Sequence, residues 1–356
     1  MSRSGTVRPD RGHPAATGVT RLQQRRRRRL AGLGALLALL VISCLLSVAV
    51  GAKSIPLADV WAALTAPTGT ENDLIVRELR IPRTAVGVLA GVCLGVAGAL
   101  MQGHTRNPIA DPGILGITHG AAVAVVLAVY TAGVTTLLGY VWFGFAGALL
   151  GAAAVFTIGS LGGRGGPTPV TLALAGMAIS YLLQAITSAL VLTDQQSLDT
   201  YRFWKVGSVA ITDTQVIAQV TPFLLVGLVL ALANSVSLNA LSLGEDVARS
   251  LGHRVKWARR TGILAISVLV GGTVAICGPI GFVGLIVPHV ARFFTGADYR
   301  WLLPFAGLSG GSLVLLADVL GRVVARPSEV QVGVMLAMVG APFFIALVRR
   351  RKLVRL

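Results

Sequence analysis

Three arginines, Arg77, Arg80 and Arg83, stand three residues apart in the segment RELRIPR, directly before an uncharged stretch. A guanidinium binds a carboxylate or a phosphate through two parallel hydrogen bonds, so these side chains could hold an anionic group of a partner. Contacts with lipid phosphate, or ion pairs with acids nearby in the sequence, would use the same chemistry. Those nearby acids are Glu71, Asp73 and Glu78. All three interpretations remain open at this point.

A second candidate lies in the polar stretch 238–260, whose centre reads LGEDVARSLG. Gly244 and Gly252 bracket a predicted short helix, and Glu245 in its first turn complements the helix dipole. Helical spacing predicts one apolar face, which holds Val247, Ala248 and Leu251. Such a helix either lies on lipid or inserts into a groove of another subunit, where the small Ala248 would permit close approach.

Catalytic chemistry is not evident. The segment NPIADPG at 107–113 predicts a tight turn and a helix start, with Asp111 as N-cap and Pro112 in the first turn. No Gly-Lys dipeptide occurs, which excludes a phosphate-binding Walker A loop. The histidines form no pair with metal-ligand spacing. We therefore expect no catalytic residue, no metal site and no cofactor, and we assign any ATP hydrolysis to a separate subunit.

The composition indicates a membrane protein. Of the 356 residues, 54% are hydrophobic and 13% are charged, and the mean hydropathy is +0.77. Several uncharged stretches exceed the 18 or so residues that mark a spanning helix. The net charge of +17 would suggest nucleic acid in a soluble protein, but the arginine run at 25–29 directly precedes an apolar stretch. That placement is typical of a topology signal, so we expect lipid and no nucleic acid.

The uncharged stretches predict an all-α polytopic protein of about ten transmembrane helices. The stretch 112–163 divides into spans 3 and 4, and the stretch 261–291 divides at Gly278, Pro279 and Gly281 into spans 7 and 8. Basic residues flank both ends of the latter, which requires an even number of crossings. With both termini cytoplasmic, nearly all of the excess positive charge lies inside. Arg77, Arg80 and Arg83 are then external, and 238–260 is a cytoplasmic loop.

A faint repeat has an offset of 180 residues, because Gly91, Gly98 and Pro108 recur as Gly271, Gly278 and Pro288. Five spans separate the copies, so spans 2–5 and 7–10 would form an inverted repeat. In a chain with 43 glycines, chance explains three matches equally well.

The sequence predicts three regions. Residues 1–29 are expected to be a disordered basic cytoplasmic tail, residues 30–351 the ten-span domain, and residues 352–356 a short cytoplasmic end. Within span 5, helical spacing aligns one partly polar stripe, formed by Met177, Ser180, Gln184, Thr187 and Val191. Hydroxyls in such helices often bond their own backbone, but an amide is costly to leave in lipid. Gln184 is therefore our candidate for a residue facing a subunit interface or an aqueous pathway.

Several long motifs, in a fixed order, make the chain similar to a known family. They are RIPR at 80–83, GALMQ and NPIADPGILGI within 98–117, GEDVARSLG at 244–252, GPIGFVGLIVPHVAR at 278–292, LLADVLGR at 315–322 and VGAPFFIALVRR at 339–350. Together they resemble the FecCD-type permeases of bacterial ABC importers, which take up iron–siderophore complexes, haem or vitamin B12.

The resemblance implies a ten-helix permease subunit of the bacterial cytoplasmic membrane that dimerises around a central pathway. Its partners would be ABC ATPase subunits, an external substrate-binding protein and a second permease copy or paralogue. By match, Arg80, Arg83 and Arg322 would meet glutamates of the binding protein, whereas Arg77 lies outside the motif. The segment with Gly244, Glu245, Ala248, Leu251 and Gly252 would couple to the ATPase, and span 5 and the last span would border the pathway.

The cargo that this resemblance favours is an iron–siderophore complex. Haem or vitamin B12 is the alternative within the family, and the spans themselves do not discriminate among them. An ion-coupled secondary transporter is the weaker hypothesis, because the predicted spans lack the charged residues that usually carry the coupled ion.

Overall fold

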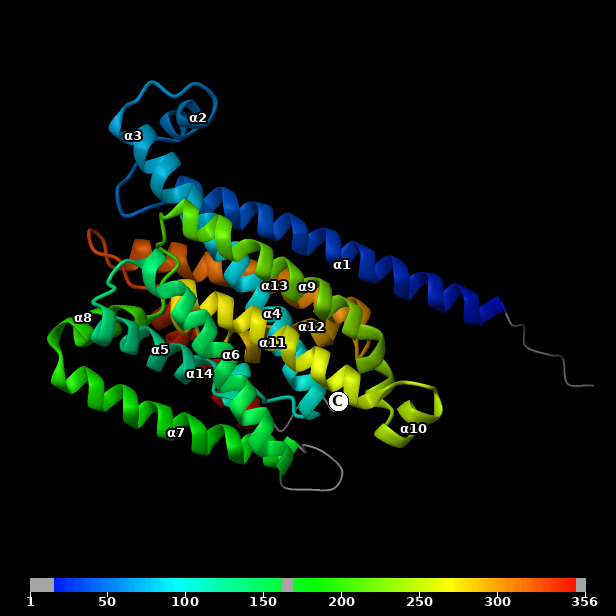
Figure 1. Cartoon of the computed structure of the whole chain (residues 1–356). Helices are drawn as coiled ribbons and strands as arrows, with labels where there is room; N and C mark the ends of the chain where they lie inside the picture. The colour runs from blue at the N-terminus through cyan, green and yellow to red at the C-terminus, as the bar shows by residue number, and fades with distance from the viewer. Residues whose placement is uncertain (1–15, 162–168, 350–356) are drawn as a thin grey trace, which may run out of the picture.

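The computed structural model describes residues 16–161 and 169–349, and within these ranges the chain is built of helices joined by short loops, with no strand (Figure 1). Seven of these helices are long and apolar enough to cross a membrane, and three more are shorter but apolar. They are α1 (Ala16–Ala49), α4 (Ile81–Thr105), α5 (Ile117–Ala132), α6 (Leu137–Leu161), α7 (Pro169–Thr193), α9 (Thr214–Ser242), α11 (Val255–Cys277), α12 (Val283–Thr295), α13 (Tyr299–Val324) and α14 (Val332–Arg349). The predicted all-α polytopic fold is confirmed.

The division of stretch 261–291 into two spans is also found. Helix α11 ends at Cys277 and α12 begins at Val283, so the break falls on the predicted Gly-Pro segment. Gly278 adopts a left-handed φ of +69°, and its α-carbon lies so close to the carbonyl of Trp204 that a side chain would collide with it. Glycine is therefore required at this turn.

Short helices decorate the two ends of the bundle. Helices α2 (Leu57–Thr65) and α3 (Glu71–Leu74) lie beyond one end, and a single π-helical segment, η1 (Ile75–Arg80), leads from α3 directly into α4. Helix α10 (Glu245–Ser250) lies at the opposite end (Figure 1). Helix α8 (Gln195–Val206) and the 3₁₀ turn η2 (Pro112–Leu115) complete the set. In η2, Asp111 accepts a hydrogen bond from the N–H of Gly113, so the predicted cap is confirmed.

Small residues allow the central helices to pack closely. Helix α4 lies along α13, where Gly91 meets Gly310 and Gly95 meets Ala306, each with backbone against backbone. Close approach of this kind replaces a hydrophobic driving force between helices in lipid. Helices α4 and α11 are largely buried within the chain, whereas α1 and α7 are largely exposed. The exposed helices are the ones left to meet lipid or other subunits.

The packing follows the predicted repeat. If spans 2–5 correspond to 7–10, then the contact of α4 with α13 has its counterpart in the contact of α11 with α6, and both pairs are packed. In the second pair Gly271 lies against Ala148, as Gly91 lies against Gly310 in the first. The pairs α5 with α6 and α12 with α13 correspond in the same way. The contact pattern thus favours a repeat over chance.

The predicted disordered tail is wrong for part of its length. Helix α1 begins at Ala16, so residues 16–29 extend the first span as helix, and residues 1–15 lie outside the described ranges. Arginine and glutamine are good helix formers, and a helix already nucleated in the span can propagate through them. Arg29 also bonds the carbonyl of Thr295 at 2.6 Å, which fixes this end of the span. The predicted end at 352–356 lies outside the described residues as well.

Candidate functional site

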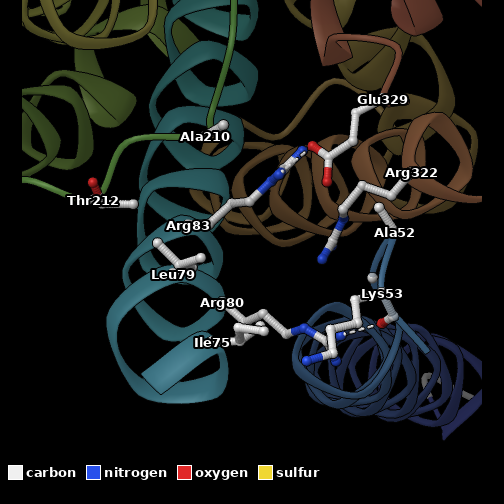
Figure 2. Close-up of a pocket in the computed structure, with 11 residues that line it drawn as sticks. Ala52, Lys53, Ile75, Leu79, Arg80, Arg83, Ala210, Thr212, Arg322 and Glu329 are labelled. Carbon is white, nitrogen blue, oxygen red and sulfur yellow. Dashed lines mark hydrogen bonds and ion pairs between the residues drawn. The ribbon is translucent and has the colours of Figure 1, made fainter. Parts of the chain in front are cut away.

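The three predicted docking arginines line one cavity, at the end of the bundle that carries α2 and α3 (Figure 2). The cavity has a volume of about 360 Å³. Arg80 comes from the end of η1, Arg83 from the first turn of α4 and Arg322 from the last turn of α13. Lys53 and Glu329 also line it, so its wall holds four cations and a single acid. Basic side chains thus outnumber acidic ones among the residues that line the cavity.

Arg80 is 4% exposed, and its side chain donates hydrogen bonds to the end of α1. Its Nη1 donates to the carbonyls of Val48 and Ala49 at 2.9 and 2.8 Å, and its Nη2 donates to the carbonyl of Lys53 at 2.7 Å. The last four carbonyls of a helix have no partner within the helix and carry its negative dipole end. Arg80 therefore satisfies backbone groups that would otherwise be orphaned.

Arg322 is 1% exposed and serves the same helix end. Its Nη1 donates to the carbonyls of Ser47 and Val50 at 2.9 and 2.8 Å, and its Nη2 lies 3.0 Å from Asp318 Oδ2. Arg326 adds a bond to the carbonyl of Gly51 at 2.9 Å. We call Arg80, Arg322 and Arg326 the α1 clamp. The clamp joins the end of α1 to η1 and to the end of α13, which is far away in the sequence.

Arg83 has a different environment, because all of its partners are side-chain carboxylates. Its Nε and Nη2 donate to the Asp318 carboxylate at 3.0 and 2.8 Å, and its Nη1 donates to Glu329 Oε2 at 2.6 Å. Asp318 is 1% exposed, whereas Glu329 is partly open to solvent. Figure 2 shows the side chains of Arg83 and Glu329 pointing toward one another at the cavity wall.

The proposed pairing with nearby acids is wrong. Glu71 pairs with Lys53 at 2.8 Å, and Asp73 accepts from the backbone N–H groups of Thr68 and Thr70 as part of a capping box. Glu78 has no ion-pair partner within the described ranges. Arg77 is exposed on η1. The acids that pair with Arg83 are Asp318 and Glu329, which are far away in the sequence.

Sequence analysis missed these two carboxylates. One signal was available, because Asp318 precedes Arg322 by four residues and such pairs meet on a helix surface. The uncharged stretch at 301–317 stops just before Asp318. Helix α13 nevertheless continues to Val324, so Asp318 and Arg322 both lie on a membrane-spanning helix. The ion pair between these two side chains lowers the free-energy cost of placing charges on such a helix.

At the opposite end, α10 has the predicted bracketing glycines, and Gly252 has a left-handed φ of +82°. The predicted single apolar face is wrong. Ala248 is fully buried against Ala240, Leu241, Val255 and Ala258, whereas Val247 and Leu251 are 43% and 61% exposed. Ala248 is small because α10 packs closely on its own chain. The surface offered outward is that of Val247 and Leu251.

Two further predicted residues have clear positions. Glu245 Oε1 lies 2.5 Å from Arg259 Nη2, which ties the start of α10 to α11. Gln184 is exposed on α7. The predicted polar stripe around Gln184 is not uniformly exposed. Thr187 is buried and donates to the carbonyl of Leu183, and Val191 is buried as well. Only the half of the stripe with Met177 and Gln184 is exposed.

At the turn before η2, the environment of Asp111 is unusual for an acid. Burial raises the pKa of the Asp111 carboxyl, and the hydrogen bond from the Gly113 N–H partly opposes that rise. The cap bond explains why an acid occupies a position that is otherwise unfavourable for charge.

Comparison with known families gives a match over most of the chain. The family model described as the FecCD transport family matches residues 39–350. The chain is 45% identical over 316 residues to the ferric enterobactin transport system permease protein FepD of Escherichia coli (strain K12), covering 89% of this chain and 94% of FepD. It is 38% identical over 325 residues to the hemin transport system permease protein HmuU of Yersinia pestis, covering 90% and 96%.

Similarity extends to a cobalamin import permease and to a solved structure. The cobalamin import system permease protein BtuC of Halobacterium salinarum is 38% identical over 280 residues, which cover 78% of this chain and 74% of that protein. An ABC transporter solved in an inward-facing conformation superposes with a TM-score of 0.78 at 30% identity, covering 90% of this chain and 99% of that one.

Proposed function

The chain belongs to the FecCD transport family and is a permease component of an ABC importer, and we propose that its cargo is an iron–siderophore complex received from an external binding protein. The observation that carries delivery by a binding protein is the cationic cavity at one end of a polytopic bundle whose other end presents an exposed helix, α10. A permease needs both surfaces, one for the protein that delivers cargo and one for the subunit that hydrolyses ATP.

For docking, we propose that glutamates of the binding protein approach the cavity of Arg80, Arg83 and Arg322. Arg83 is the residue best suited to direct contact, because Glu329, its partly exposed partner, can be exchanged for another carboxylate. Arg80 and Arg322 hold the α1 end and give the cavity its shape and positive charge. Arg77, exposed nearby, can add to the attraction.

For coupling, we propose that the segment with Gly244, Glu245, Ala248, Leu251 and Gly252 contacts an ATPase subunit. In this arrangement Leu251 is the contacting side chain, Ala248 seats α10 on α9 and α11, and Glu245 fixes its angle through Arg259. The two glycines supply the turns at either end.

The cargo proposal draws on the relatives. Permeases named for ferric enterobactin and for iron(3+)-hydroxamate are 45% and 41% identical to this chain, and those named for hemin and cobalamin are 38% identical. Haem and vitamin B12 thus remain the alternative cargo. We further propose that the subunit pairs with a copy or a paralogue, with α7 and α14 beside the pathway and Gln184 facing it.

An ion-coupled transporter is the second candidate, since Asp318 is a carboxylate on a spanning helix. Two arginines of the same chain pair with that carboxylate, at 2.8 and 3.0 Å, so it is already occupied and not open to a coupled ion. ATP-driven import is therefore favoured.

The test is transport by the complete complex in proteoliposomes, with ferric siderophores, haem and cobalamin offered in parallel. We expect uptake of a ferric siderophore that stops with vanadate and survives a protonophore. Uptake that collapses with the protonophore would contradict ATP coupling, and uptake of haem or cobalamin alone would contradict the cargo.

A further inference from the structure

A second cavity, of about 490 Å³, lies where α8 meets α5, the turn at Pro279 and α14. This volume is in the range of small-molecule sites. Helix α8 contributes Tyr201, Trp204 and Lys205 to its wall, and α5 contributes His119. No acidic side chain lines it. We call this cavity the Lys205 pocket.

One face of α8 gives the Lys205 pocket its character. Trp204 and Lys205 follow Tyr201 by three and four residues, so the helix brings both side chains beside the Tyr201 ring. The rings of Tyr201 and Trp204 stack, with centroids 6.4 Å apart and planes 26° apart. The ammonium of Lys205 lies 5.4 Å from the centre of the Tyr201 ring. The face thus combines a flat aromatic surface with a positive charge.

The face is held firmly in place by backbone bonds after α8. The N–H of Ser208 donates to the carbonyl of Cys277 at 2.7 Å, and the N–H of Gly333 donates to the carbonyl of Gly207 at 3.1 Å. These bonds attach α8 to the end of α11 and to the start of α14. The pocket wall is therefore preorganised, which lowers the entropic cost of binding a guest.

Two polar groups of the wall have no partner in the part of the chain that the structure describes: the indole N–H of Trp204 and Nδ1 of His119. Trp204 is only 7% exposed. A buried donor without an acceptor is costly, and an oxygen-rich guest is the kind of ligand that offers one.

We propose that the Lys205 pocket contacts the cargo during its passage, and that it selects an anionic metal chelate with aryl-oxygen arms. The inference rests on the proposed function and adds the chemical class of the cargo. The ammonium of Lys205 balances the negative charge of the chelate, and the stacked rings of Tyr201 and Trp204 pack against its aryl groups. Val334 and Ala337 of α14 form the apolar opposite wall.

The first experiment compares two charge reversals on α8 in the complete reconstituted complex. Lys205→Glu should lower ATP-driven uptake of the ferric complex of a tricatecholate chelator about tenfold, while ATPase activity stimulated by cargo-free binding protein changes less than twofold. The matched control is Arg202→Glu, because Arg202 is exposed, pairs with Asp199 and does not line the pocket. Equal uptake in the two variants would overturn the proposal.

A second measurement does not depend on transport. In a permease from which Cys44, Cys93 and Cys277 have been removed, Ala337→Cys reports on the pocket and Ile345→Cys reports on an exposed part of α14 outside it. The ferric tricatecholate should slow maleimide labelling at 337 and leave 345 unchanged. Unprotected labelling at 337 would overturn the pocket even if wild-type uptake is normal. Protected labelling without ATP-driven uptake would instead contradict the proposed function.

Discussion

At the scale of single residues, the arginines of the cavity differ in the kind of oxygen that each one binds. Arg80 and Arg322 donate mainly to backbone carbonyls of the α1 end, which no partner protein could replace without unfolding that end. Arg83 binds only carboxylates, and one of them, Glu329, is partly exposed. A carboxylate that arrives from outside can therefore exchange with Glu329 while Asp318 keeps Arg83 in position.

This view predicts the effect of Glu329→Gln. An exposed ion pair contributes about 0.2–1 kcal/mol, so removing the internal competitor should tighten binding of the substrate-binding protein by up to about fivefold. Surface plasmon resonance on the reconstituted permease would measure it, at two salt concentrations to isolate the charge effect. Glu78→Gln is the matched control, since Glu78 is exposed nearby and has no ion pair within the described ranges. Weaker binding by Glu329→Gln would contradict the exchange.

At the scale of elements, the α1 clamp attaches a helix that has little else to bury. Helix α1 is largely exposed in the chain, so its position depends on a few strong contacts. Arginines from η1 and α13 cap its last carbonyls, which are the groups that a helix leaves unpaired. A cationic side chain there also complements the dipole.

Removing one member of the clamp should therefore lower stability before it changes docking. Arg322→Met leaves the Ser47 and Val50 carbonyls without this donor, and we expect a loss of roughly 3 kcal/mol, at the low end for breaking a buried pair because Arg83 still neutralises Asp318. Arg326→Met removes one partly buried bond and should cost only about 1 kcal/mol. Thermal unfolding in detergent would measure both. Unchanged stability of Arg322→Met with lost docking would favour a direct docking role.

Helix α10 yields a second prediction at this scale. Leu251→Ala should reduce transport per ATP hydrolysed, because it truncates the exposed apolar contact, and it should leave thermal stability unchanged. Ala248→Trp should instead lower stability by about 1–3 kcal/mol, because the site is fully packed by α9 and α11. Ser250→Ala, on the same short helix and exposed, is the control. A fully stable Ala248→Trp variant that is nonetheless uncoupled would contradict this account.

The sequence predicts the elements well where one physical rule dominates. Uncharged length locates the spans, and Gly278 with Pro279 locates the break between α11 and α12. Sequence-based prediction fails where an interaction joins residues that are far apart in the chain. Arg83 and Asp318 are 235 residues apart, and no local pattern pairs them. The burial of Ala248 likewise depends on how α10 folds back onto α9 and α11, which helical spacing alone does not specify.

At the scale of the whole molecule, the two functional ends are separated by the full length of the bundle. Helices α2 and α3 with the arginine cavity lie at one end, and α10 lies at the other (Figure 1). No element of the described chain belongs to both ends except the long spans themselves. Any signal from ATP hydrolysis to cargo release must therefore pass as a movement of packed helices. Close glycine contacts such as Gly91 with Gly310 make rigid-body motion of α4 and α13 as one unit the simplest route.

Orientation in the membrane decides which end meets which partner. Arg254, Lys256, Arg259 and Arg260 cluster beside α10, and positive loops remain cytoplasmic, so we expect α10 inside and α2 outside. Single cysteines in a background without Cys44, Cys93 and Cys277 would test this. With a membrane-impermeant maleimide, Ala66→Cys, at the end of α2, should label in intact spheroplasts, whereas Ser250→Cys should label only after permeabilisation. The reverse pattern would place the arginine cavity beside the ATPase and would contradict its proposed role in receiving cargo from outside.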